Sequence, residues 1–141
     1  MTQANTSSTP VFRTIEVGTG VPITLGEPLS AQAMELVDKV GERHYRLKPD
    51  TFGDAEEIDI RLTAGAAVQQ MDFRYAAGSN YKEMVANFEG RMGPPTSHHG
   101  SGDDVVTVWQ DDATVFRLVG SASGIRSILR DRAVTDAEAT A

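Results

Sequence analysis

The chain has 141 residues, of which 40% are hydrophobic, and it contains no cysteine. This length supports one domain that buries roughly 70% of the surface of its unfolded chain, and without thiols there can be no disulfide, thiolate zinc site or cysteine nucleophile. The net charge of -7 repels nucleic acid and anionic lipid, so we expect neither as a partner. No apolar run approaches the roughly 20 residues of a membrane helix, which argues against membrane insertion.

Both ends of the sequence are predicted to be disordered tails. Residues 1–10 are polar and rich in serine and threonine, and residues 133–141 combine alanine, threonine and acidic residues without periodicity. The first tail lacks the basic and apolar regions of a signal peptide, so the cytoplasm is the default compartment. Residues 11–132 between the tails are predicted to form a single domain.

The first half of this domain is predicted to contain four strands and one helix. Alternating apolar and polar residues predict a first strand at residues 11–17. Ser30 is a suitable N-cap for a helix that runs to Gly41, a natural helix stop. Alternation then returns and predicts three further strands, at residues 42–48, 56–63 and 67–76. Since polar residues occupy the alternate positions, we expect an antiparallel sheet with one face in solvent.

The second half begins with a helix after the N-cap Asn80. Glu83 follows the cap by three residues, as in a capping box, and apolar residues then recur at helical spacing. A Gly-Pro-Pro sequence ends the pattern. The remaining segments predict a hairpin and a final strand or short helix, at residues 105–110, 114–120 and 124–131.

Together these elements predict an α+β fold in which an antiparallel sheet packs two helices on one face. The two halves can also be aligned at an offset of 52 residues, which would make the domain two tandem αβββ units. This alignment pairs the two predicted helices: Leu29 with Tyr81, Ala33 with Val85, Leu36 with Phe88, Val40 with Met92 and Gly41 with Gly93. A duplication and a chance likeness of two amphipathic helices both account for it.

A known repeat is similar to the second half. The helix that ends in RMGPP, a polar loop and the segment VWQDDATVFRLV resemble the repeat of the beta-lactamase inhibitory protein fold, and also that of outer-membrane assembly lipoproteins of the SmpA/OmlA type. The resemblance covers residues 23–130 as architecture and rests on five residues: Gly93, Pro94, Trp109, Asp111 and Thr114. The chain departs from these families in lacking a lipobox cysteine and stabilising disulfides. The resemblance implies a protein-binding module rather than an enzyme.

The stretch TSHHGSGDD, residues 96–104, is the main candidate for metal-dependent chemistry. His98, His99, Asp103 and Asp104 are all suitable ligands for zinc or a similar ion. Adjacent residues of an extended segment point in opposite directions, however, and the glycines of this stretch favour a mobile polar loop. We therefore predict no metal, cofactor or catalytic residue, and keep a metal-dependent enzyme that uses His98 and His99 as an alternative.

Trp109 is the most informative residue for partner binding. In VVTVWQ, Val106 and Val108 take one face of the strand while Trp109 takes the other. If the valines face the core, Trp109 lies on the open face of the sheet, where an aromatic ring flanked by arginines has the composition of an interface hot spot. The alternative is that Trp109 and Phe116 form a core pair and the valines lie outside.

The predicted function is a soluble, non-catalytic protein-binding or inhibitory module that presents an open sheet face or a connecting loop to another protein. The predicted partner-binding residues are Trp109, Tyr75, Arg74 and Arg117. Arg126, Arg130 and Arg132 add positive charge as solvated surface or as a contact for an acidic partner. An acidic dimeric secretion-type chaperone is the other alternative, because such proteins share size, charge and element order with this chain. We therefore expect a monomer or a homodimer.

Overall fold

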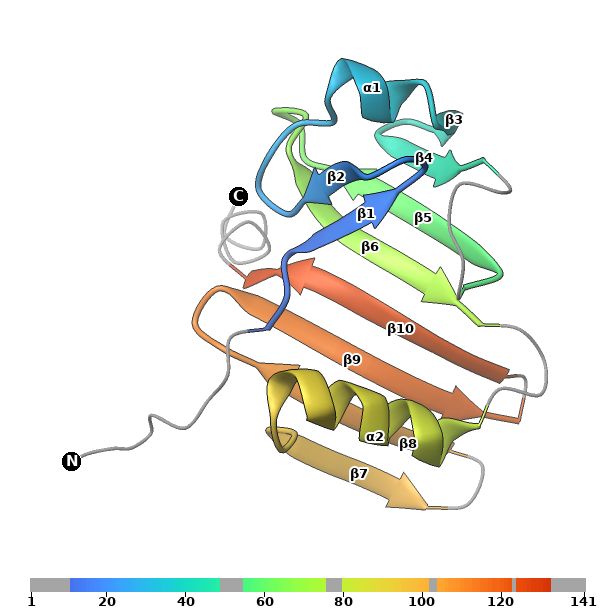
Figure 1. Cartoon of the computed structure of the whole chain (residues 1–141), viewed down its shortest axis with the longest axis vertical. Helices are drawn as coiled ribbons and strands as arrows, with labels where there is room; N and C mark the ends of the chain where they lie inside the picture. Colours follow the sequence, from blue (N-terminus) through green and yellow to red (C-terminus); the bar gives the residue numbers. More distant parts are fainter. Residues whose placement is uncertain (1–10, 49–54, 76–79, 102–103, 123, 133–141) are drawn as a thin grey trace.

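A long antiparallel sheet forms the body of the molecule (Figure 1). The structure, a computed structural model, describes residues 11–48, 55–75, 80–101, 104–122 and 124–132. In chain order its elements are β1 (Thr14–Val17), β2 (Val21–Thr24), α1 (Ala31–Met34), β3 (Val37–Gly41), β4 (His44–Leu47), β5 (Glu57–Leu62), β6 (Val68–Arg74), α2 (Tyr81–Met92), β7 (Ser97–Ser101), β8 (Asp104–Gln110), β9 (Thr114–Ser121) and β10 (Gly124–Asp131). Within these residues the large sheet has the order β3-β4-β5-β6-β10-β9-β8-β7, and β1 pairs with β2 in a separate hairpin.

The predicted α+β class with a largely antiparallel sheet is confirmed, but each helix precedes four strands rather than three. Strands β3 to β6 follow α1, and strands β7 to β10 follow α2. The two four-stranded meanders meet where β6 pairs antiparallel with β10, and Met71 lies opposite Leu129 at this seam. The last strand of one meander therefore adjoins the last strand of the other.

The first helix is much shorter than predicted. It has four residues and begins after Ser30, whose hydroxyl accepts a hydrogen bond from the Ala33 N–H at 3.1 Å. Val40 and Gly41, predicted to be helical, lie in β3, which pairs with β4. Strand pairing thus overrides the helical spacing of the apolar residues. The alignment at an offset of 52 residues also fails beyond α1, because Val40 is in a strand whereas Met92 is in a helix.

The second helix agrees with its prediction. The Asn80 side chain accepts a hydrogen bond from the Glu83 N–H at 3.1 Å and caps α2. Tyr81 fastens this helix to the sheet, because its hydroxyl lies 2.7 Å from Thr107 Oγ1 and donates to the Leu118 carbonyl at 2.9 Å. Burial raises the pKa of Tyr81, so the phenol remains a protonated donor in this contact.

Three further segments correct or complete the predicted strands. The stretch at residues 96–104, predicted to be a loop, contains β7, which pairs with β8 at one end of the sheet. The first segment is a strand only from Thr14 onward and pairs with β2, which was not predicted. The final segment, left open between strand and helix, is β10. The residues of β7 and β2 themselves give only a weak strand pattern, and each of these strands forms because it pairs with a neighbour.

The large sheet has one covered face and one open face. α2 and the β1–β2 hairpin lie against the same face, which we call the covered face, and α1 sits at the β3 end of the sheet (Figure 1). The opposite face, which we call the open face, carries no helix or strand from the described part of the chain. The largest fully buried hydrophobic side chains are Trp109, Phe116, Ile23, Ile60, Met71, Leu118 and Leu129.

Candidate functional site

Trp109, the first residue of the predicted partner site, is in the core. It is 2% exposed, its ring centroid lies 5.8 Å from that of Phe88 and 5.9 Å from that of Phe116, and its Nε1 donates to the Gly93 carbonyl at 3.0 Å. Of the two placements that the sequence left open, the open-face position of Trp109, on which its predicted role in partner binding depended, is therefore wrong, and the core pair of Trp109 and Phe116 is confirmed. The physical reason is that α2 covers this face, and bulky aromatic rings fill the space between helix and sheet.

The other three predicted residues divide between the two faces. Tyr75 lies on the covered face, where its hydroxyl is 2.7 Å from Ser127 Oγ. Arg74 and Arg117 are exposed on the open face. Arg74 lies 3.3 Å from Glu57, so its charge is already paired. The structure therefore brings Arg74 and Arg117 to one face but does not gather the four predicted residues into one site.

One half of the open face neutralises its own charges. Across β4, β5 and β6, Arg46 donates to Asp59 at 2.7 Å and Arg61 lies 3.4 Å from Asp72. Burial raises the pKa of Asp59, but the hydrogen bond from Arg46 and the adjacent His44, whose Nε2 is 3.3 Å from the Asp59 carboxylate, outweigh burial and hold this pKa below its usual value. This half of the face therefore presents a ladder of paired charges.

The other half of the open face is apolar, and two of its arginines have no acidic partner among the described residues. Five partly exposed aliphatic side chains of β8, β9 and β10 form what we call the valine patch: Val106, Val108, Val115, Val119 and Ile128. Arg117 lies in register between Val108 and Ile128, and Arg126 lies opposite Val119. Among the residues that the structure describes, neither arginine forms an ion pair with a carboxylate. The valine patch therefore combines apolar surface with two positive charges that no carboxylate of the described residues pairs with.

The histidines of β7 do not gather ligands around one point. His98 Nδ1 lies 2.8 Å from Thr107 Oγ1, and His99, as its neighbour in a strand, takes the opposite face of the sheet. Asp103 lies outside the described residues. Within the ranges that the structure describes, no group of three or more His, Asp or Glu side chains is placed to hold a metal ion.

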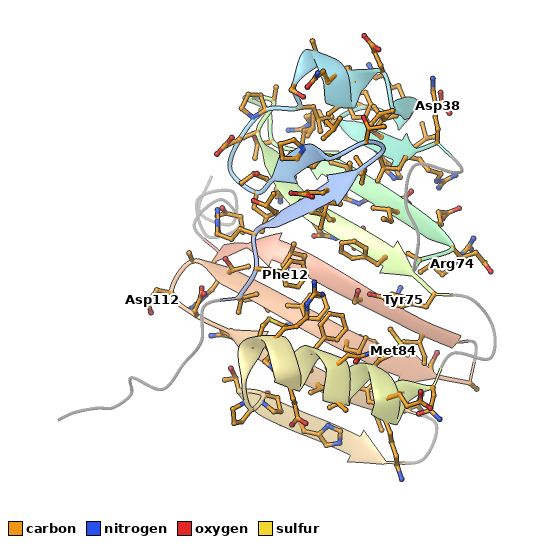
Figure 2. The ribbon with its side chains drawn as sticks, viewed as in Figure 1. Phe12, Asp38, Arg74, Tyr75, Met84 and Asp112 are labelled. Carbon is orange, nitrogen blue, oxygen red and sulfur yellow. The ribbon has the colours of Figure 1, made fainter. Side chains whose placement is uncertain are left out.

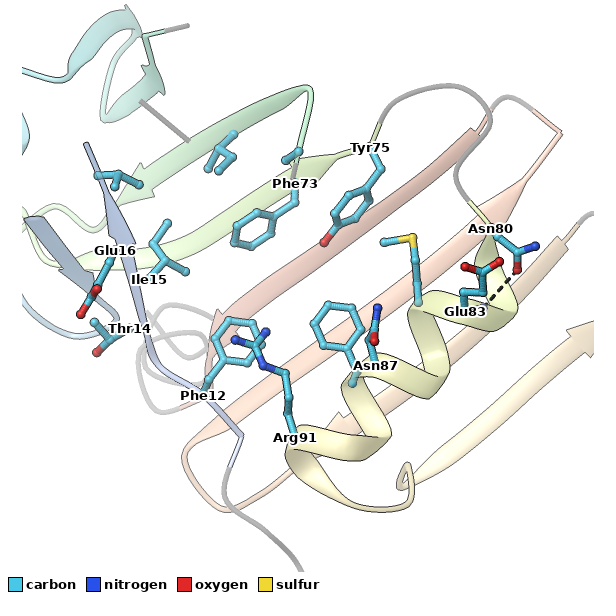
Figure 3. A pocket seen from close by; sticks show the side chains of 15 residues that line it. Phe12, Thr14, Ile15, Glu16, Phe73, Tyr75, Asn80, Glu83, Asn87 and Arg91 are labelled. Atoms are coloured by element: carbon cyan, nitrogen blue, oxygen red, sulfur yellow. Dashed lines mark hydrogen bonds between the residues drawn. The ribbon is translucent and has the colours of Figure 1, made fainter. Parts of the chain in front are cut away.

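A cleft on the covered face was not predicted from the sequence. It has a volume of about 1150 Å³ and lies between β1 and α2, above β5 and β6 (Figure 3). Phe12, Tyr75 and Met84 all point into the region between the hairpin and the helix (Figure 2). Local sequence patterns give no signal for this cleft, because β1 and α2 are about 60 residues apart and meet only through the folded sheet.

Comparison of the chain with protein-family models, with curated proteins and with solved structures finds no match. The resemblance to the beta-lactamase inhibitory protein repeat and to the SmpA/OmlA-type lipoproteins is therefore not tested by a relative, and it stays a prediction from the residues. Across the described ranges, neither helix has the length and apolar character needed to cross a bilayer. The function has to be inferred from the two surfaces described above.

Proposed function

We propose that this protein is a non-catalytic module that binds another protein through the valine patch on the open face of its sheet. The observation that carries the proposal is the placement of Arg117, exposed and without an acidic partner among the described residues, between the aliphatic side chains of Val108 and Ile128. Apolar side chains interleaved with arginine are typical of the centre of a protein interface.

The chemistry of the patch defines the partner that would bind it. Covering the patch takes Arg117 and Arg126 out of water, which is unfavourable unless the partner supplies carboxylates to pair with them. The partner surface is therefore expected to carry aliphatic or aromatic side chains beside Asp or Glu. The partner is expected to dock on β8 to β10 and not on β4 to β6, because the charges on β4 to β6 already pair with one another.

The repeat-like architecture supports this proposal. Two units of one helix and four strands, joined last strand to last strand, form one continuous open face across both. We infer that the units are an internal repeat whose last strands pair at the seam, where Met71 lies opposite Leu129. The resemblance to the inhibitory protein repeat implies partner binding rather than catalysis, although each unit here has four strands instead of the three of the predicted αβββ unit.

The metal-dependent enzyme has less support than the binding module. An ion between His98 and His99 would need one of the two side chains to leave its face of the sheet, and His98 already contacts Thr107. The dimeric chaperone makes a different prediction for the same surface, since a second copy of this chain would then cover the valine patch. The experiment therefore has to distinguish another protein from a second copy.

Matched surface variants test the proposal. The full chain is immobilised and exposed to an extract of its source, in parallel with Val108→Asp, Arg117→Glu and the control Lys82→Glu. The control reverses a charge on an exposed residue of α2, on the covered-face side of the molecule. Far-ultraviolet circular dichroism checks that each variant is folded. We expect one stoichiometric partner on the wild type and on Lys82→Glu, with weaker capture as salt is raised, and loss of that partner on the other two.

Two outcomes would overturn the proposal. One is a partner that the wild type, Val108→Asp and Arg117→Glu capture equally, because the interface would then lie elsewhere. The other is a dimer in light scattering that Val108→Asp converts to a monomer. A second copy of this chain would then occupy the valine patch, and the hypothesis of a dimeric chaperone would be favoured.

A further inference from the structure

The cleft on the covered face is a second surface, separate from the valine patch. Its floor is apolar and consists of Ile58 of β5, Phe73 of β6 and Tyr75, which directly follows β6, while Asn87 and Arg91 of α2 lie on its rim (Figure 3). Its volume of about 1150 Å³ is slightly above the range of roughly 300–1,000 Å³ that small-molecule sites occupy. A molecule that binds in this cleft can therefore bury apolar groups against the floor and keep its polar groups at the rim.

The strand that forms one wall of the cleft is paired along one edge only by the part of the chain that the structure describes. Among the described residues β1 pairs with β2 alone. The Leu25 N–H donates to the Arg13 carbonyl at 3.0 Å, so the backbone groups of Arg13 face β2. Hydrogen-bonded positions alternate along an antiparallel pair, and the backbone N–H and C=O groups of Ile15 and Val17 therefore face β2 as well.

The intervening residues of β1, Thr14 and Glu16, therefore direct their N–H and C=O groups away from β2. Pro22 lies opposite Glu16 and has no N–H to donate, which agrees with this phase. Both residues line the cleft. Two donors and two acceptors, alternating at the spacing of a strand, thus border an apolar floor.

We propose that the cleft binds an extended peptide segment of a partner protein, which adds to β1 as a third strand. An extended backbone presents donors and acceptors at the same repeat as Thr14 and Glu16, so it can satisfy all four groups at once. Alternate side chains of the added strand point down to Phe73 and Tyr75, and the others point out toward the polar rim. The bound segment is therefore expected to alternate apolar and polar residues.

Amide hydrogen exchange gives a direct test with an internal control. The full chain is screened against a phage-displayed library of short random peptides, and an enriched peptide is added to the isotope-labelled protein. We expect the amides of Thr14 and Glu16 to become protected, because they face the added strand. The amides of Ile15 and Val17 should change little, because they already pair with β2.

A proline variant isolates the strand edge. Thr14→Pro removes one of the two outward N–H groups of β1, and its matched control Thr14→Val keeps that N–H while losing the same side-chain hydrogen bond to Thr24 Oγ1. We expect peptide affinity to fall by about tenfold in Thr14→Pro relative to Thr14→Val. Arg117→Glu, which disables the valine patch, should leave peptide binding unchanged, so the failure of one site is distinguishable from the failure of the other.

Any of four results would overturn the proposal. Slow exchange of the Thr14 and Glu16 amides in the free protein would mean that the chain itself already occupies the edge. A bound peptide that leaves these two amides unprotected, or that binds Thr14→Pro as tightly as Thr14→Val, would place the peptide elsewhere. A library that yields no peptide binding to the wild type would leave the cleft to small molecules.

Discussion

Replacing Trp109 tests which face of the sheet is buried, and so tests the placement of both candidate sites. The side chain is 2% exposed and packs between α2 and the sheet against Phe88 and Phe116. Truncating a buried tryptophan to alanine removes its apolar contacts and leaves a cavity, at a cost of about 3–5 kcal/mol. The lost hydrogen bond to the Gly93 carbonyl belongs to this total. Since a domain is stabilised by about 5–15 kcal/mol, Trp109→Ala should remove a large part of it.

The adjacent residue provides the matched comparison. Val108 is partly exposed on the open face, so Val108→Ala should lower the free energy of unfolding by less than about 1 kcal/mol. Trp109→Phe should fall between the two, at about 1–2 kcal/mol, because it retains an aromatic ring but loses the indole N–H. All three values come from urea unfolding followed by far-ultraviolet circular dichroism.

The same residue reports its own environment, because Trp109 is the single tryptophan of the chain. Its fluorescence in the folded protein should be that of an indole shielded from water and should resist a soluble quencher. A readily quenched tryptophan would refute this placement of Trp109, and so would a larger loss of stability in Val108→Ala than in Trp109→Ala. Either result would mean that the face with Val108 is buried and the face with Trp109 is open.

Three further predictions concern how the fold is held together, and urea unfolding measures each. Gly120→Ala should cost about 1–3 kcal/mol because the new methyl group would lie 2.9 Å from the Tyr81 ring, whereas Gly90→Ala, with open space around it in α2, should gain about 1 kcal/mol; equal effects would contradict the helix docking. Arg13→Ala should cost about 2–4 kcal/mol because Arg13 pairs with the buried Asp131, and a loss below about 0.5 kcal/mol would show that this anchor of the hairpin is dispensable. The pKa of Asp59 lies below its usual value when folded, so its ionised form stabilises the protein above about pH 4 and this contribution is lost as the pH falls through the folded pKa. Asp59→Asn should therefore destabilise by about 1 kcal/mol at pH 6 and progressively less as the pH falls through the folded pKa of Asp59, and a pH-independent loss would contradict the assignment.

Several elements follow from local sequence because their stabilising interactions are local. The N-cap contact of Asn80 with Glu83 spans three residues, and the structure contains it as the spacing predicts. The hairpin of β8 and β9 likewise joins strands that are adjacent in sequence. Its turn is closed by Asp111, whose side chain accepts hydrogen bonds from the N–H groups of Ala113 and Thr114. The antiparallel arrangement with one solvated face also follows from alternation alone.

Other elements form only because distant segments supply their partners. The spacing of Leu36 and Val40 predicts a helix, yet the chain from Val37 to Gly41 becomes β3 because β4 lies beside it and pairs with it, with one shift of register between Lys39 and Gly41. Similarly, His98 and His99 belong to a strand because β8 lies beside them. Neither pairing leaves a signal in the segment that it reorganises.

The sequence by itself determined that this chain folds as an α+β protein with a two-faced antiparallel sheet, and it placed the N-cap of α2 at Asn80. Only the tertiary structure decided which side α2 covers, and with it that Trp109 belongs to the core and Val108 to the valine patch. Alternation along a strand defines two faces but not which of them is buried, because burial depends on where a helix from another part of the chain docks. The cleft beside β1 arises in the same way, since its walls meet only after the sheet has formed.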